Sequence, residues 1–92
     1  MIEIELILVN RHGLHLRPAS KFVEIANRYP AKVFVAVNGG DEGDGKSILD
    51  LSARAAGKGA RLSIRADGEG AEQVLDELAA LVRSGFGELT EE

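Results

Sequence analysis

Apolar and polar residues alternate at the start of the chain. Apolar side chains occupy every even position from Ile2 to Leu8, and two glutamates stand between them. A period of two is typical of a strand with one buried face. The same period returns at Val33–Val37 and Ala60–Ala66. The pattern therefore predicts three strands, the first of them reaching Val9.

Other segments repeat their apolar residues at helical spacing. Between Ala19 and Ala26 they stand at positions i, i+3, i+4 and i+7, which predicts an amphipathic helix. This helix should end at Tyr29, because the proline that follows disfavours helix in the residue before it. The range Ala71–Arg83 predicts a second long helix, and Ser47–Arg54 a shorter one.

The segment 39–45 is rich in acidic residues and glycine, and we expect at most a short edge strand at 41–44. The order is then strand, helix, strand, edge strand, helix, strand, helix. Strands with one wet face and amphipathic helices favour an α+β, open-faced two-layer sandwich, an antiparallel sheet of about four strands covered on one face by three helices. We expect one domain at 1–88 and a frayed tail at 89–92.

Composition limits the classes of function. The 92 residues, 45% of them apolar, suffice for one core but not for a deep, enclosed active site. The net charge of −4 argues against a nucleic acid partner, because phosphate backbones select basic surfaces. No cysteine is present, which excludes disulfides and Cys-type zinc sites. No apolar run approaches the roughly 20 residues that span a bilayer, and the start lacks signal-peptide features. A cytoplasmic protein without membrane insertion is expected.

Candidate chemistry gathers where the first helix begins. His15 and Arg17 fall in its predicted first turn. A helix start presents backbone N–H groups and the positive end of the peptide dipoles, which together favour anions. Imidazole is a nucleophile and guanidinium a phosphate clamp. The combination predicts a histidine that carries a phosphoryl group, rather than an ordinary surface histidine.

Neighbouring residues support this phosphate site. Leu16 has no side-chain oxygen to occupy the helix start, so a phosphate can take that place. Pro18 restricts the backbone and removes one donor, and Ala19 completes the phosphate-supporting turn. His12 with His15 suggests a metal pair, but no acidic ligand is identifiable nearby. A solvated turn histidine is the preferred interpretation of His12, and no metal or cofactor is expected.

One further motif has two interpretations. Residues 40–47 match the P-loop pattern GxxxxGK[ST], which suggests nucleotide binding. Its three acidic residues, Asp41, Glu42 and Asp44, would repel a polyphosphate, and the chain is short for a nucleotide-binding parallel sheet. We therefore interpret the match as a coincidence.

The segment Gly13–Ser20 (GLHLRPAS) resembles the active-site motif of HPr, the histidine-containing phosphocarrier family of the bacterial sugar phosphotransferase system. Residues 46–48 (KSI) resemble the second signature of the family, and 84–88 resemble its ending. The resemblance implies that His15 takes phosphate on Nδ1 from phospho-enzyme I and passes it to IIA components of sugar transporters. It implies a monomeric phosphoryl carrier rather than an enzyme, without a cofactor.

The second signature has a structural and a functional interpretation. Ser47 suits the N-cap of the short helix. It also matches the serine that HPr kinase/phosphorylase modifies in some bacteria, so a regulatory or nitrogen-system paralogue is the alternative function. Ile48 and Leu49 are expected to be exposed for partner docking with Lys46 at the rim, while Leu51 enters the core. The opposing interpretation places all three apolar residues in the core.

Two features depart from the family pattern. The family usually has a small residue where this chain has Leu16. A bulky side chain there affects partner fit but leaves the backbone donors in place. The acidic segment 39–45 is about one residue longer than expected, which puts the third strand in question rather than the chemistry of His15.

Overall fold

The computed structural model describes residues 1–54 and 57–87. The frayed tail predicted at 89–92 lies outside these residues. The elements, in chain order, are β1 (Ile2–Ile7), α1 (Leu16–Ala26), β2 (Lys32–Val37), β3 (Gly43–Asp44), α2 (Ile48–Ala53), β4 (Arg61–Asp67), α3 (Ala71–Arg83) and a 3₁₀ turn, η1 (Gly85–Gly87).

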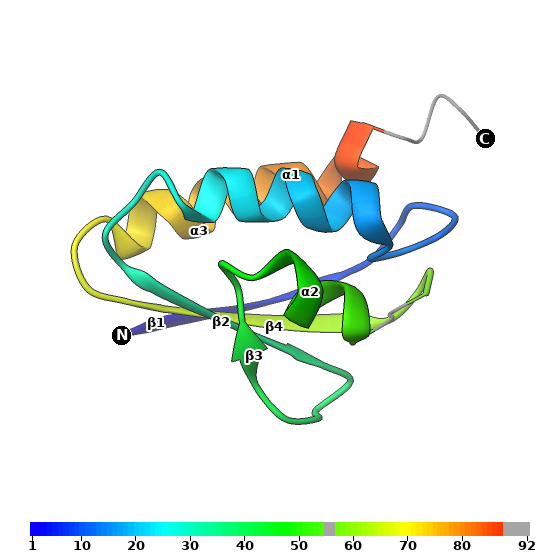
Figure 1. Ribbon diagram of the computed structural model, residues 1–92, viewed down its shortest axis with the longest axis horizontal. Coiled ribbons are helices and arrows are strands. Elements are labelled where there is room, and N and C mark those ends of the chain that lie inside the picture. The colour runs from blue at the N-terminus through cyan, green and yellow to red at the C-terminus, as the bar shows by residue number, and fades with distance from the viewer. Residues whose placement is uncertain (55–56, 88–92) are drawn as a thin grey trace.

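The strands form one antiparallel sheet in the order β1-β4-β2-β3. Its register places Ile64 opposite both Ile4 and Val35, so apolar residues of three strands line one face. Figure 1 shows the helices on that face, with α1 and α3 side by side over the sheet and α2 packed beside α1. With four strands and three α-helices among residues 1–54 and 57–87, the predicted α+β open-faced sandwich is confirmed.

The core lies between the sheet and the helices. Phe22 of α1 and Leu78 of α3 are fully buried, and so is Leu62 of β4. Phe86 in η1 is also fully buried, and its carbonyl oxygen accepts a 2.6 Å hydrogen bond from Lys21 Nζ. The segment after α3 is thereby attached to α1, one turn beyond the start of that helix.

Two predicted C-terminal ends of elements are wrong by two residues or more. β1 ends at Ile7 rather than Val9, although Leu8 still exchanges backbone hydrogen bonds with residues 59 and 60. The prediction that α1 extends to Tyr29 is wrong by three residues, since it ends at Ala26. The N–H groups of Arg28 and Tyr29 bond to carbonyls three residues back, which tightens the last turn before the proline is reached.

The acidic segment 39–45 forms the expected edge strand, which is only two residues long. β3 consists of Gly43 and Asp44, which pair with Val35 and Phe34 of β2. Among residues 1–54 and 57–87, no helix is long and apolar enough to cross a membrane.

Candidate functional site

A closed turn positions the start of α1. Asn10 is fully buried, and its Nδ2 donates a 2.7 Å hydrogen bond to the carbonyl oxygen of Gly13. The Gly13 N–H returns a 3.2 Å bond to the carbonyl of Asn10. Gly13 has a φ of +63°, a conformation that glycine adopts without steric cost, and Leu14 anchors the next position in the core. The turn therefore fixes the direction in which the backbone enters α1 at His15.

His15 is the N-cap residue of α1. Its backbone is extended, with φ −84° and ψ −173°, and its carbonyl accepts the N–H of Ala19 at 3.0 Å. Within the described part of the chain its side chain makes no capping hydrogen bond. The half-buried imidazole thus stands at the positive end of an 11-residue helix.

The residues after His15 divide between solvent and core. Leu16 is the first helical residue and 65% exposed, and Arg17 is exposed beside it. Pro18 and Ala19 are buried, so they fix the first turn against the core. Of the three residues predicted to support a phosphate, only Leu16 therefore faces solvent.

His12 lies close to His15 but is exposed. The two rings meet edge to face, with centroids 5.9 Å apart and planes at 87°. In the described ranges, no three His, Cys, Asp or Glu side chains gather as a metal site would require.

The short helix α2 separates its leucines by environment. Leu51 is completely buried, whereas Leu49 is 83% exposed. The predicted burial of Leu51 and the predicted exposure of Leu49 are confirmed, and the interpretation that places Ile48, Leu49 and Leu51 all in the core is wrong. Ile48, predicted to be exposed, is instead half-buried and packs against the core.

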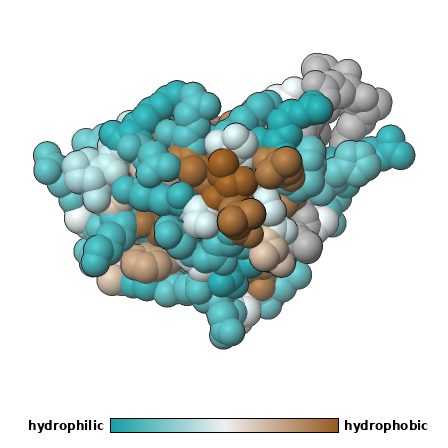
Figure 2. Space-filling model, viewed as in Figure 1, coloured by the Kyte–Doolittle hydropathy of each residue, from teal (hydrophilic) through white to brown (hydrophobic). Residues whose placement is uncertain are grey.

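In the orientation of Figure 1, apolar surface gathers over α1 and α2, as Figure 2 shows. Leu16 and Leu49 are the large exposed apolar residues of these two helices.

Lys46 lies away from the start of α1. Its Nζ donates a 2.7 Å hydrogen bond to the carbonyl oxygen of Tyr29, just beyond the other end of that helix. Eleven residues of α-helix separate the two ends by about 16 Å. The ammonium is held where helix carbonyls attract a cation, rather than at a rim around His15.

A family model described as "PTS HPr component phosphorylation site" matches residues 2–84. The chain belongs to the HPr family.

Known HPr proteins match over nearly their whole length. The chain is 41% identical to the phosphocarrier protein HPr of Pseudomonas aeruginosa over 88 residues, 96% of this chain and 98% of that protein. It is 38% identical to HPr of Haemophilus influenzae, covering 87% of this chain and 91% of that one. A crystal structure of HPr from Thermoanaerobacter tengcongensis superposes with a TM-score of 0.89 at 30% identity, covering 96% and 98% of the chains. The chain is thus a phosphocarrier of the phosphotransferase system by family.

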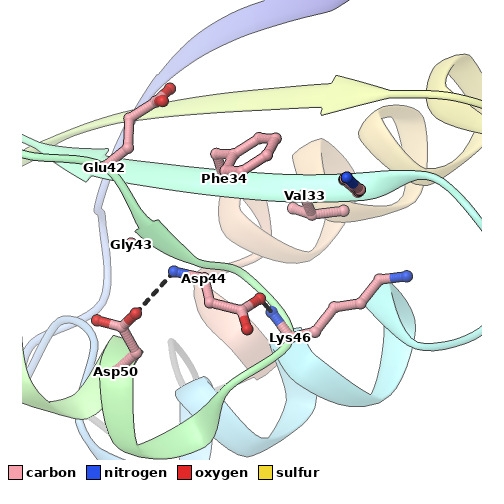
Figure 3. Close-up of a pocket in the computed structure, with 8 residues that line it drawn as sticks. Val33, Phe34, Glu42, Gly43, Asp44, Lys46 and Asp50 are labelled. Atoms are coloured by element: carbon pink, nitrogen blue, oxygen red, sulfur yellow. Dashed lines mark hydrogen bonds between the residues drawn. The ribbon is translucent and has the colours of Figure 1, made fainter.

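The local geometry also opposes the nucleotide-binding interpretation of residues 40–47. β3 is a two-residue strand at the sheet edge, not a central parallel strand. The Lys46 N–H donates to Asp44 Oδ1 at 2.9 Å, and the Asp44 N–H donates to Asp50 Oδ2 at 2.7 Å, as the dashed lines in Figure 3 show. In a P-loop such backbone donors cradle phosphate. Here they are satisfied by carboxylates.

Ser47 is the N-cap of α2, as predicted. Its Oγ accepts a 3.1 Å hydrogen bond from the Asp50 N–H. Sequence reasoning did not assign a role to Asn10, which holds the turn before His15. An asparagine three residues before a glycine was the available signal.

Proposed function

We propose that His15 accepts a phosphoryl group from phospho-enzyme I and passes it to the IIA components of sugar permeases. The observation that carries the proposal is the place of His15, the N-cap residue of α1, where the positive end of the helix favours an added negative charge. In this interpretation the chain is a carrier that its partners load and unload, rather than an enzyme. It acts in the cytoplasm as a monomer.

The proposed step exchanges one bond to phosphorus for another. The lone pair of the imidazole Nδ1 attacks phosphorus, a new N–P bond forms, and the bond to the enzyme I donor breaks with its electron pair remaining on the donor. Arg17, two residues after His15, is proposed to bind the phosphoryl oxygens, a task that suits a planar guanidinium. The positive end of α1 favours the negative charge that arrives. Transfer to IIA is the same exchange in the opposite sense.

Docking is proposed to use the apolar surface of α1 and α2. Leu16 at 65% exposure and Leu49 at 83% offer apolar contact area on the two helices that meet in this part of the fold. Ile48 contributes the part of its side chain that the core leaves uncovered. An apolar centre with charged residues around it is typical of transient protein interfaces.

Regulation through Ser47 is the second proposal. HPr kinase/phosphorylase would have to reach a half-buried hydroxyl that already accepts the Asp50 N–H. The phosphate would then add negative charge to the docking helix and change its electrostatic fit to partner proteins. A nitrogen-system paralogue would use the same His15 chemistry with different IIA acceptors.

The deciding experiment is the intact mass of the protein after incubation with phosphoenolpyruvate and enzyme I. We expect one phosphoryl group that is lost in brief acid treatment and is absent from His15→Ala. His12→Ala is the matched control and should still be phosphorylated. A phosphorylated His15→Ala protein would overturn the assignment of the acceptor.

A further inference from the structure

The helix α2 is short, so its orientation depends on contacts with the rest of the fold. It has six residues, and helices of that length are not stable in isolation. Leu51 fixes one side of it in the core. On the side of β3, a groove of about 480 Å³ is lined by Asp50 of α2, by Gly43 and Asp44 of β3 and by residues of β2. Figure 3 shows this groove, with Asp50 of α2 pointing toward Asp44 of β3.

Arg54, the C-cap residue of α2, makes polar contacts between the helix and the segment 41–44. Its Nε lies 3.1 Å from Asp50 Oδ1, and its Nη1 donates a 2.6 Å hydrogen bond to the carbonyl oxygen of Asp41. The other oxygen of Asp50 accepts the Asp44 N–H at 2.7 Å. Arg54 and Asp50 together therefore attach both ends of the segment 41–44 to α2.

Gly43 makes room for this arginine. A Cβ added at Gly43 would lie 2.0 Å from Arg54 Nε, 2.5 Å from Cζ and 2.6 Å from Nη2, distances that no real contact allows. The φ angle of Gly43 is not positive, and its pairing with Val35 is ordinary antiparallel register. The backbone conformation therefore does not require glycine here. A side chain at position 43 would instead force the guanidinium of Arg54 out of its present place.

The negative charge of the segment 41–44 explains why a cation at position 54 stabilises this arrangement. Asp41, Glu42 and Asp44 are acidic, and so is Asp50 on the facing helix. Glu42 is bound on the sheet side by Arg65, with oxygen–nitrogen distances of 2.6 and 2.7 Å. Arg54 provides the corresponding cation on the helix side. Without it, the carboxylate of Asp50 would face the acidic segment with less compensation.

We propose that Arg54 is a positioning residue, whose guanidinium, laid across Gly43 and bonded to Asp41 and Asp50, fixes α2 in the orientation that presents Leu49 to partner proteins. The inference rests on the proposed function, because it assigns docking to α2. It concerns the affinity for partners and not the phosphoryl chemistry at His15.

The test compares Arg54→Ala, Gly43→Ala and the double variant as acceptors of phosphate from enzyme I. Either single change should raise the KM of enzyme I for the carrier about three- to tenfold with kcat unchanged, because the change affects association only. The double variant should be no worse than Arg54→Ala, since the new methyl group then meets no guanidinium. Arg28→Ala is the matched control, because it removes exposed ion pairs with Glu24 of α1 and Glu77 of α3, away from α2.

Thermal unfolding of the same variants tests the contact without any partner. Gly43→Ala should lower the Tm of the natural chain but leave the Tm of Arg54→Ala unchanged. Additive losses, or an unchanged KM in Arg54→Ala, would overturn the proposal. If the natural chain accepts no phosphate, the proposed function fails, while the coupling in Tm still decides whether Arg54 depends on Gly43. If Arg54→Ala does not fold, Arg54→Lys replaces it and should lose the bond to Asp41 while keeping the pair with Asp50.

Discussion

Leu49 and Leu51 stand two positions apart on α2, yet 83% of the first side chain is exposed and the second is completely buried. Two helical positions correspond to a rotation of roughly 200°, so the two leucines point to opposite sides. The same residue type can therefore be compared at a buried and at an exposed position of one short helix.

The two leucines should therefore respond differently to truncation. Leu51→Ala should lower the free energy of unfolding by about 2–5 kcal/mol, because it leaves a cavity in the core. Leu49→Ala should change the free energy of unfolding by less than about 0.5 kcal/mol. It should, however, raise the KM of enzyme I for the carrier. Urea unfolding and transfer kinetics measure the two effects. A Leu49→Ala protein that accepts phosphate with an unchanged KM would place docking elsewhere.

Arg17→Ala should slow the transfer of phosphate to His15 by about ten- to a hundredfold while leaving the final stoichiometry at one, because it removes a charged donor from the developing phosphoryl charge. Arg17→Lys should recover part of the rate, since an ammonium keeps the charge without the planar fork. Rapid-quench kinetics measure the rate of phosphate transfer to His15 in each variant. Arg11→Ala, a change at an exposed arginine of the preceding turn, is the control and should transfer normally.

Ser47→Ala should destabilise the fold by about 1 kcal/mol, because the Asp50 N–H loses its capping oxygen. Ser47→Asp should retain most of the stability, since aspartate also caps helices well. Denaturant midpoints distinguish the two variants. Equal stability of Ser47→Ala and the natural chain would show that the Ser47 cap does not stabilise α2.

The pair of Glu42 and Arg65 should make stability depend on pH. The hydrogen bond from Arg65 lowers the pKa of the Glu42 carboxyl below its usual value of 4.5, and the charge of Arg65 adds to this effect. Because the pKa is lower in the folded state, the stabilisation is complete above pH 4.5 and is lost as the pH falls through the folded value. Unfolding midpoints between about pH 5 and pH 2 should therefore fall less steeply in Glu42→Gln. An equally steep fall in that variant would assign the acid sensitivity to other carboxylates.

Much of the fold could be predicted because each strand and helix repeats its own apolar period. The same regularity explains the errors at the ends of elements. The apolar pattern continues to Tyr29, but the backbone tightens after Ala26, and the pattern contains no information on that choice. The position of His15 at a helix start was also predictable, because the proline and the apolar stripe after it mark the first turn.

Contacts between distant segments were not predictable in this way. Lys46 was expected beside the docking surface, but its ammonium bonds to the carbonyl of Tyr29, 17 positions earlier in the chain. The close approach of Arg54 to Gly43 likewise joins the end of a helix to an edge strand. Periodicity assigns a face to a residue on its own element and does not state which other element lies opposite.

By itself, the sequence determined the class of fold, the helix start that carries His15 and the membership of the HPr family, because local periods and a short motif specify all three. Only the tertiary structure decided that Ile48 is half-buried, that Lys46 lies far from His15 and that Arg54 holds the acidic segment to α2. These outcomes depend on how the elements pack, because burial and hydrogen bonding between elements are set by the whole fold and not by neighbours in the chain.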